Sequence, residues 1–308
     1  MKSLLSMCAI LLAFCVVSQA ATWNVPGDYA TIADAINSTS VADGDTIFVA
    51  AGNHAGAFVT KSVEIKGDDG AVISSGPVHG SGLIQGFRLM AGSGGATISH
   101  LIFMVDLAIM NGAAVGNVTV ENCTFLNSVQ AISNWGGSGW LISHNVITDL
   151  RTRNGGGIGI LVADRSGGVV QHNVVSHNKI SGTLDASAPV EKGGYNGSGI
   201  VLYADFRYDQ SGTQAITNNS VTKNNISLVS NKPSLVDVCA FELTEARDEE
   251  SPTYTYCIFD NSIVFNDFRG TALQIVLTPE DLDEHNNISR NLGDSRGHGS
   301  HPSVFSAN

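Results

Sequence analysis

Short apolar runs that each end at an asparagine recur along most of this chain. In VVQHNVVSHNKISG (Val169–Gly182), alternating apolar and polar residues lead to Asn173 and then to Asn178. The pattern, with an asparagine at both positions, returns at Asn122 and Asn127, Asn219 and Asn224, Asn261 and Asn266, and Asn286 and Asn291. A further copy has Asn145 at the first position and Leu150 at the second. Each run predicts a short β-strand, and the repetition predicts an array of similar units.

Strands of about three to five residues are too short to form a stable sheet alone, so the units must stabilise one another. Parallel stacking places each strand between the equivalent strands of the neighbouring units, about 4.8 Å away. In such a stack Asn173 and its equivalents turn inward, and each hydrogen-bonds to the next asparagine of the column. The asparagines are therefore predicted to be architectural rather than catalytic.

The segment before the first repeat has a different pattern. TIADAINS (Thr31–Ser38) places apolar residues at helical spacing, and the short strand segments GDTIFVAAGNH and SVEIKGDDGAVISS follow it. This order resembles the N-terminal cap of right-handed parallel β-helices of the pectin-lyase-like superfamily, and the asparagine-bearing repeats resemble the coils of that superfamily. The resemblance implies one all-β domain, a right-handed parallel β-helix with a short N-terminal capping helix and about eight to ten coils.

Three segments are expected along the chain. Residues 1–20 combine Lys2, an apolar run and a small-residue cleavage site before Ala21, which is the pattern of a secretory signal peptide. Residues 21–291 are assigned to the β-helix, with the N-terminal cap at about 21–75, and residues 292–308 to a polar C-terminal tail. The mature protein is expected to be secreted or periplasmic, and no later apolar run is long enough to span a bilayer.

Charge and cysteine content narrow the partners further. A net charge of −12 disfavours nucleic acid and anionic membranes as partners. Three cysteines lie beyond the signal segment, so at most one disulfide forms within the chain, and Cys239–Cys257 is the expected pair, with Cys123 left over. A monomer is expected.

A second repeated sequence motif contains the candidate catalytic and metal-binding residues. It appears as ILVAD, VLYAD and FELTE, each ends at an acid, and an arginine follows shortly after each acid. The acids are Asp164, Asp205 and Glu245, and the arginines are Arg165, Arg207 and Arg247. If the three coils share one register, the acids form a column and the arginines lie beside it. Clustered carboxylates are the ligands that Ca²⁺ prefers, so the acids are candidate metal ligands.

The resemblance attaches a reaction to this column. Pectate-lyase-type enzymes of the fold are similar in using Ca²⁺ with an arginine for β-elimination on polyuronates. By that analogy the three acids hold Ca²⁺, Arg165 or Arg207 is the catalytic base, and Arg247 binds the uronate carboxylate. Exposed ion pairs at the ends of loops are the alternative explanation of the same residues.

Polar residues, histidines among them, precede the first asparagines. His144 and His172 are predicted to point outward from adjacent coils, where they are candidates for substrate binding or for a shared transition metal. The same column contains Glu121, Asn218 and Asp260, and such a mixture is also typical of a solvated face.

Two functions remain open from the sequence. The first is a secreted protein that binds or cleaves an acidic polysaccharide, as a Ca²⁺-dependent polyuronate lyase or a relative of one. Loops inserted at Thr183–Asn196, Phe206–Gly212 and Ala246–Tyr254 favour it, since loops lengthened on one side of a solenoid form the wall of a groove. The second is a non-catalytic surface or matrix protein that presents an adhesin-like or glycan-binding face. Missing hydrolase and esterase motifs favour this second function.

Overall fold

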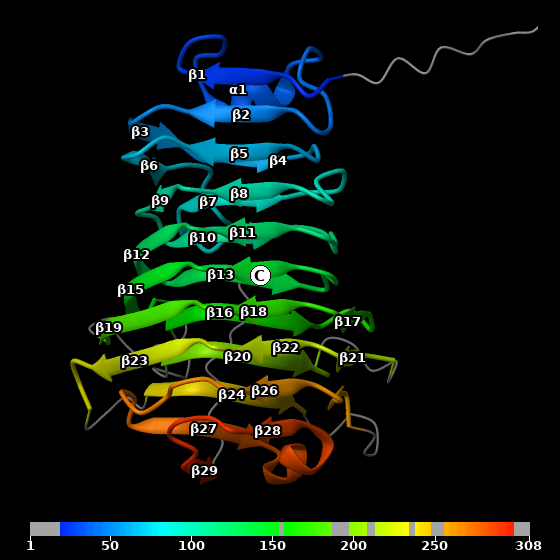
Figure 1. The fold of residues 1–308 in the computed structure, drawn as a ribbon, viewed down its shortest axis with the longest axis vertical. Coiled ribbons are helices and arrows are strands. Elements are labelled where there is room, and N and C mark those ends of the chain that lie inside the picture. Colours follow the sequence, from blue (N-terminus) through cyan, green and yellow to red (C-terminus); the bar gives the residue numbers. More distant parts are fainter. Residues whose placement is uncertain are drawn as a thin grey trace, which may run out of the picture.

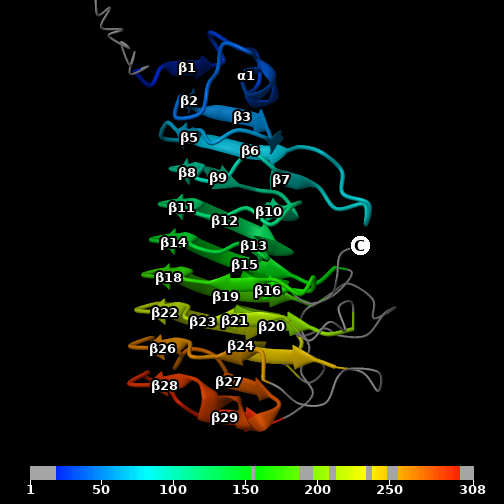
Figure 2. The same ribbon diagram turned by 90° about the vertical axis from the view of Figure 1, so that its right-hand side faces the viewer.

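The computed structural model describes residues 19–153, 157–186, 197–207, 213–233, 238–247 and 256–298. These residues form a right-handed parallel β-helix, in which long parallel sheets run along one solenoid (Figure 1, Figure 2). The predicted fold class is therefore confirmed. The part of the chain that is described contains no helix long and apolar enough to cross a membrane. Most of the predicted signal segment lies outside the described residues and stays a prediction.

Sheet A is the longest sheet. Its strands in order are β1 (Thr22–Val25), β2 (Thr46–Val49), β5 (Glu64–Gly67), β8 (Thr97–Ser99), β11 (Thr119–Glu121), β14 (Leu141–Ser143), β18 (Val174–Ser176), β22 (Ser220–Thr222), β26 (Ser262–Val264) and β28 (Asn287–Ser289). Neighbouring strands pair in parallel, so each strand belongs to one coil of the solenoid. The ten strands in the described ranges agree with the number of coils expected from the sequence.

Sheets B and C complete each coil. Sheet B contains β3 (Gly52–Ala55), β6 (Ala71–Ser75), β9 (Ile102–Phe103), β12 (Thr124–Ser128), β15 (Val146–Arg151), β19 (Lys179–Asp185) and β23 (Asn225–Ser230). Sheet C contains β4 (Ala57–Val59), β7 (Gln85–Leu89), β10 (Leu107–Asn111), β13 (Gln130–Trp135), β16 (Gly157–Asp164), β20 (Gly197–Asp205), β24 (Val238–Ala246), β27 (Leu273–Thr278) and β29 (Arg296–His298). A short sheet of β17 (Val169–Gln171), β21 (Ala215–Thr217) and β25 (Ile258–Phe259) is added in three late coils.

Helix α1 (Ile32–Asn37) covers the N-terminal end of the solenoid, as the sequence predicts (Figure 1). The Thr31 hydroxyl caps it by accepting a hydrogen bond from the backbone N–H of Asp34 at 3.0 Å. Its apolar face, with Ile32, Ala35 and Ile36, is buried against the first coil. The cap closes a stack of strands whose upper edge would otherwise be open to solvent. A 3₁₀-helix, η1 (Glu280–His285), precedes the last strand of sheet A.

Two asparagine columns run inside the C-terminal half of the solenoid. Asn173, Asn219, Asn261 and Asn286 form one column, joined by amide-to-amide hydrogen bonds of 2.8–2.9 Å. The other column consists of Asn145, Asn178, Asn224, Asn266 and Asn291, joined by bonds of 2.9–3.0 Å. The amides of the other column members besides Asn173 also donate to a backbone carbonyl of a neighbouring coil, as Asn224 does to Val175 at 2.9 Å. The predicted architectural role of the asparagines is confirmed.

The columns begin later than the repeat predicts. Asn122 and Asn127 are exposed, and Leu150 belongs to the core. Asn145 occupies the second column, because its side chain accepts from the N–H of Cys123 and donates to Asn178. The prediction that Asn145 is equivalent to Asn122 and Asn173 is therefore wrong. Coils before these columns place apolar residues at the same inward positions, so van der Waals packing replaces amide hydrogen bonds there.

The C-terminal end and the cysteines also differ from the predictions. Residues Arg296–His298 form β29 and pair with β27, so the solenoid continues into the segment predicted to be a polar tail. Cys123, Cys239 and Cys257 are all buried and form no disulfide, so the expected Cys239–Cys257 disulfide is wrong. Cys257 packs in the main core, whereas Cys239 hydrogen-bonds with Ser198 outside that core, at 3.0 Å between Sγ and Oγ.

Sheet C is buried on both faces, unlike an ordinary exposed sheet. Its inward residues, such as Ile160, Ile200 and Phe241, belong to the main core. Its outward residues form separate apolar clusters, one around Leu161 and Tyr203. A strand covered on both faces reads as a continuous apolar run rather than as an alternating one. The outer face of sheet C is therefore a structured environment in which side chains are held in place.

Candidate functional site

The predicted column of three acids does not form. Strand pairing sets Asp164 opposite Ala204, and Ala204 opposite Glu245, while Asp205 lies opposite Ala246. The middle phrase is thus displaced by one residue relative to the other two. The reason is that Ile160 and Ile200 must both face the core, and a slip of one residue would turn them outward. Asp205 consequently belongs to the opposite face of the sheet from the other two acids.

Asp164 and Asp205 each accept hydrogen bonds from residues that are close to them in the sequence. Asp164 accepts hydrogen bonds from the Ser166 hydroxyl and from the backbone N–H groups of Ser166 and Gly168, at 3.0–3.1 Å. Asp205 is fully buried and accepts from Tyr203 and from two nitrogens of the Arg207 guanidinium. The Asp205 contacts explain the neighbouring Arg207 as local structure, whereas Asp164 is held by Ser166 and Gly168.

Glu245 links its own coil to the next coil of the solenoid. Its carboxylate accepts from the backbone N–H groups of Cys257 and Ile258, at 2.6 and 3.0 Å, and pairs with Arg247 at 2.8 Å. The Arg247 guanidinium lies 4.0 Å from the centre of the Phe206 ring. The three acids therefore do not fit a shared calcium site. Within the described ranges, no group of three or more His, Cys, Asp or Glu side chains is placed to hold a metal ion. Calcium binding stays a prediction from the sequence.

The two candidate histidines lie in different columns. His144 directly follows strand β14 of sheet A, and its ring stacks on that of His177, with centroids 4.8 Å apart and planes 3° apart. His172 instead pairs through its backbone with Asn218. His144 and His172 do come from adjacent coils, because β14 pairs with β18, but their predicted equivalence is wrong, because the asparagine after His144 belongs to the second column. Both histidines are exposed at tight corners with φ of 57–58°.

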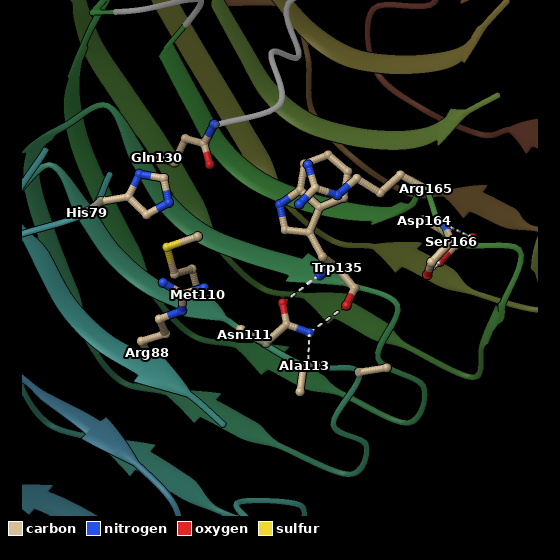
Figure 3. Close-up of a pocket in the computed structure, with 12 residues that line it drawn as sticks. His79, Arg88, Met110, Asn111, Ala113, Gln130, Trp135, Asp164, Arg165 and Ser166 are labelled. Atoms are coloured by element: carbon tan, nitrogen blue, oxygen red, sulfur yellow. Dashed lines mark hydrogen bonds between the residues drawn. The ribbon is translucent and has the colours of Figure 1, made fainter. Parts of the chain in front are cut away.

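A pocket on the outer face of sheet C brings together residues from four of its strands or their ends (Figure 3). Its volume is about 190 Å³. The lining residues used below are His79, Arg88, Gln130, Trp135, Asp164 and Arg165. Of the sequence-predicted site residues, Asp164 and Arg165 line the pocket, whereas Arg207, Arg247, His144 and His172 do not. The Asp164 carboxylate turns toward Ser166 (Figure 3).

A hairpin forms one wall of the pocket. It runs between β6 and β7, with Val78 paired antiparallel to Ile84, and protrudes from the solenoid (Figure 2). Leu83 anchors it by packing with Leu107, Met110 and Val129 on the outer face of sheet C. This anchoring holds His79, which is 7% exposed, over the pocket. Local backbone hydrogen bonds across the hairpin fix the same arrangement.

Arg88, on β7, crosses the floor of the pocket. A Cβ atom on Gly112 would lie 2.5 Å from the Arg88 Nε, so the guanidinium lies against the bare backbone of that glycine. The Nε is buried without a hydrogen-bond partner. No contact of Arg88 with a carboxylate is found among the described residues. An arginine that is partly desolvated and not neutralised by a neighbouring acid is a strong attractor for an anion.

Trp135 provides an aromatic surface opposite Arg88. The Asn111 side chain fixes the end of its strand, since it donates to the Trp135 carbonyl at 2.6 Å and accepts from the Trp135 N–H at 2.7 Å (Figure 3). The Arg165 guanidinium lies 5.2 Å from the ring centre, and Tyr203 packs edge-on against the ring. The indole is therefore held rigidly at the rim of the pocket, which suits it for stacking against a ring of a ligand.

The pocket is electropositive in an acidic protein. Burial lowers the pKa of His79 below its ordinary value of 6.5, and the nearby Arg88 and Arg165 lower it further. His79 is therefore neutral at pH 7. The backbone N–H of Ser81 donates to the Nδ1 of His79 at 3.2 Å, so the proton of the neutral ring resides on Nε2. The arrangement offers donors and positive charge to a ligand, while the Nδ1 lone pair of His79 is already engaged.

Sequence reasoning missed His79, Arg88 and Trp135. All three lie in segments without a repeated acid–arginine phrase, and two of them follow ordinary strand patterns. The available signals were the rarity of tryptophan, with three in the chain, and the Gly- and Ser-rich insertion around His79. Neither signal shows that the hairpin folds back onto the outer face of sheet C.

Comparisons with known proteins add little beyond the fold. Neither a model of a known protein family nor a curated protein matches the chain. Among solved structures, a catalytic domain of a GH87 alpha-1,3-glucanase in complex with tetrasaccharides is similar at a TM-score of 0.35 and 11% identity, over 90% of this chain and 67% of that one. PfbA, a surface adhesin of Streptococcus pneumoniae, is similar at a TM-score of 0.30 and 10% identity, over 85% of this chain and 88% of that one. Likeness at this level carries no argument about function.

Proposed function

We propose that this protein is a β-helix that binds an acidic polysaccharide, with one uronate residue held in the pocket on the outer face of sheet C. The observation that carries the proposal is Arg88, a partly buried guanidinium without a carboxylate partner among the described residues, opposite the fixed ring of Trp135. A guanidinium recognises a carboxylate, and an aromatic ring stacks on the apolar face of a sugar ring. A volume of about 190 Å³ is below the usual range for drug-sized ligands and suits a single ring.

Each residue has a defined part in this binding. Arg88 pairs through its terminal nitrogens with the sugar carboxylate, and the Nε2–H of His79 donates to a second ligand oxygen. Trp135 stacks on the apolar face of the ring, and Gln130, which is 7% exposed, offers its amide to a hydroxyl. Because buried polar groups discriminate strongly between ligands that satisfy them and ligands that do not, the pocket favours uronates over neutral sugars.

Binding without cleavage is the form of the function that the geometry supports. β-Elimination needs a base that removes the proton next to the carboxylate. The Nδ1 of His79 accepts the Ser81 N–H. Of the two predicted arginine bases, Arg165 lies over the Trp135 ring, and Arg207 is paired with Asp205 away from the pocket. The lyase of the sequence analysis and its Ca²⁺ ion are therefore not part of the proposal.

Calorimetry with trigalacturonate and with the neutral trisaccharide maltotriose tests the function. Trigalacturonate is expected to bind, maltotriose to bind at least tenfold more weakly, and Arg88→Gln to lose the difference between them. Arg290→Gln is the matched control, since Arg290 is an exposed arginine 5.4 Å from the Phe265 ring, outside the pocket. Equal affinity of wild type and Arg88→Gln for trigalacturonate would overturn the proposal.

A further inference from the structure

The hairpin that carries His79 places an ionisable side chain against the arginines of the pocket. The ring is buried, and in the described part of the chain the charged groups that face it are Arg88 from β7, with Arg165 and Asp164 from the end of β16. The remaining lining residues from β10 and β13 are uncharged, among them Met110, Asn111, Gln130 and Trp135. Since the Asp164 carboxylate is occupied by Ser166 and Gly168, positive charge dominates among the described residues around His79.

Ser81 allows His79 to change its protonation state without leaving its place. In the neutral ring, Nδ1 accepts the Ser81 N–H at 3.2 Å, and the Ser81 Oγ lies 2.8 Å from the same nitrogen. A hydroxyl both donates and accepts. When Nδ1 gains a proton, the short contact persists with its polarity reversed, because the Ser81 oxygen then accepts from Nδ1–H. The longer bond from the Ser81 N–H is given up.

We infer that binding of an acidic sugar in this pocket is coupled to the uptake of one proton by His79, so that capture tightens as the pH falls. The inference rests on the proposed function. A carboxylate beside Arg88 offsets the positive charge around His79, and it supplies an acceptor for the second N–H of the imidazolium. The ligand thus favours the protonated ring, and by linkage the protonated ring favours the ligand.

The sign follows from the direction of the shift. In the free protein the pKa of His79 lies below 6.5, and the bound carboxylate raises that pKa. Above the bound-state pKa the affinity is independent of pH. Between the two pKa values the affinity rises as the pH falls, by at most tenfold per pH unit for a single proton. Below the free-state pKa it becomes constant again, as long as the sugar carboxylate remains ionised.

Isothermal titration calorimetry with trigalacturonate, from pH 5 to 8 and in buffers of different ionisation enthalpy, tests the coupling. Wild type is expected to take up a fraction of a proton that rises and falls across this range, with the dissociation constant decreasing toward low pH. His79→Gln, which retains an amide donor, is expected to bind without proton uptake and with a flat pH profile. His100→Asn, a change at an exposed corner outside the pocket, is expected to behave as wild type.

The outcomes separate the two proposals. Binding in wild type without proton uptake overturns the coupling and leaves the proposed function standing. Proton uptake that persists in His79→Gln and in a second variant, His79→Asn, overturns the assignment to His79. No binding of trigalacturonate by folded wild type at any pH in the range overturns the proposed function and the coupling with it.

Discussion

Gly112 is predicted to control the affinity for acidic sugars without touching the ligand. In Gly112→Ala, the new methyl group would lie 2.5 Å from the Arg88 Nε and 2.7 Å from the Met90 Sδ, closer than non-bonded atoms approach. The φ of Gly112 lies outside the left-handed region, so alanine adds no backbone strain. The atoms in the way belong to flexible side chains. Arg88 therefore moves while the coil keeps its structure.

The expected loss follows from the contact that Arg88 makes. A hydrogen bond to a charged group contributes about 1.5–3 kcal/mol, so losing it weakens trigalacturonate binding about 10- to 150-fold. Stability should change by less than about 1 kcal/mol, because only side chains shift. Calorimetry gives the dissociation constant, and urea unfolding followed by circular dichroism gives the stability.

A matched glycine serves as the control for this experiment. A Cβ atom on Gly94 would lie 3.4 Å from the Gly116 carbonyl oxygen, which is an ordinary contact. Gly94→Ala should therefore bind as wild type. Wild-type affinity in Gly112→Ala, with Arg88→Gln impaired, would refute the positioning role of Gly112. A large loss of stability in Gly112→Ala would refute the reasoning that only side chains yield.

Further predictions concern stability, thiols and calcium. Asn224→Ala should destabilise the protein by about 3–5 kcal/mol in urea unfolding, since its side chain makes five hydrogen bonds to other described residues. Asn225→Ala, at the exposed neighbouring residue, is the control. An equal loss of stability in the two variants would contradict the stabilising role of the asparagine columns. Burial raises the pKa of the Cys123 and Cys257 thiols to about 12, so a thiol reagent at pH 8 should react with neither before unfolding. Because strand register separates Asp164 and Glu245 from Asp205, a Ca²⁺ titration should give no binding heat that depends on all three acids; chelator-sensitive release of unsaturated ends from polygalacturonate would instead restore the lyase hypothesis.

The fold could be predicted from the sequence because its signals are local and repeated. Helical spacing identified α1, and the recurrence of asparagines identified the stacked coils. The register in which the strands pair was harder to predict from the sequence. Apolar side chains on both faces of sheet C remove the alternation that normally fixes it, and the one-residue displacement of Asp205 follows from this. Likewise, either asparagine of a repeat could have been matched to Asn145, and the wrong choice displaced His144.

The pocket could not be predicted, because contacts between coils and an inserted hairpin create it. Arg88 and Trp135 are 47 residues apart in the sequence and meet only through the stacking of β7, β10 and β13. His79 joins them because Leu83 packs on the outer face of sheet C. Of the pocket residues, only Asp164 and Arg165 were predicted to belong to a site, and they line its edge for a different reason, since Arg165 packs over Trp135.

The contrast between a pocket rich in positive charge and a net charge of −12 has a consequence for recognition. At long range the protein repels a polyanion, so electrostatic steering does not accelerate encounter, and screening by salt relieves this repulsion. At short range, Arg88 and the carboxylate attract one another in a partly desolvated pocket, where salt screens them less. Affinity should therefore depend on the fit of one uronate ring and only weakly on ionic strength. A basic surface that gathers polyanions without selection would instead lose affinity steeply with added salt, so the salt dependence of trigalacturonate binding distinguishes the two modes.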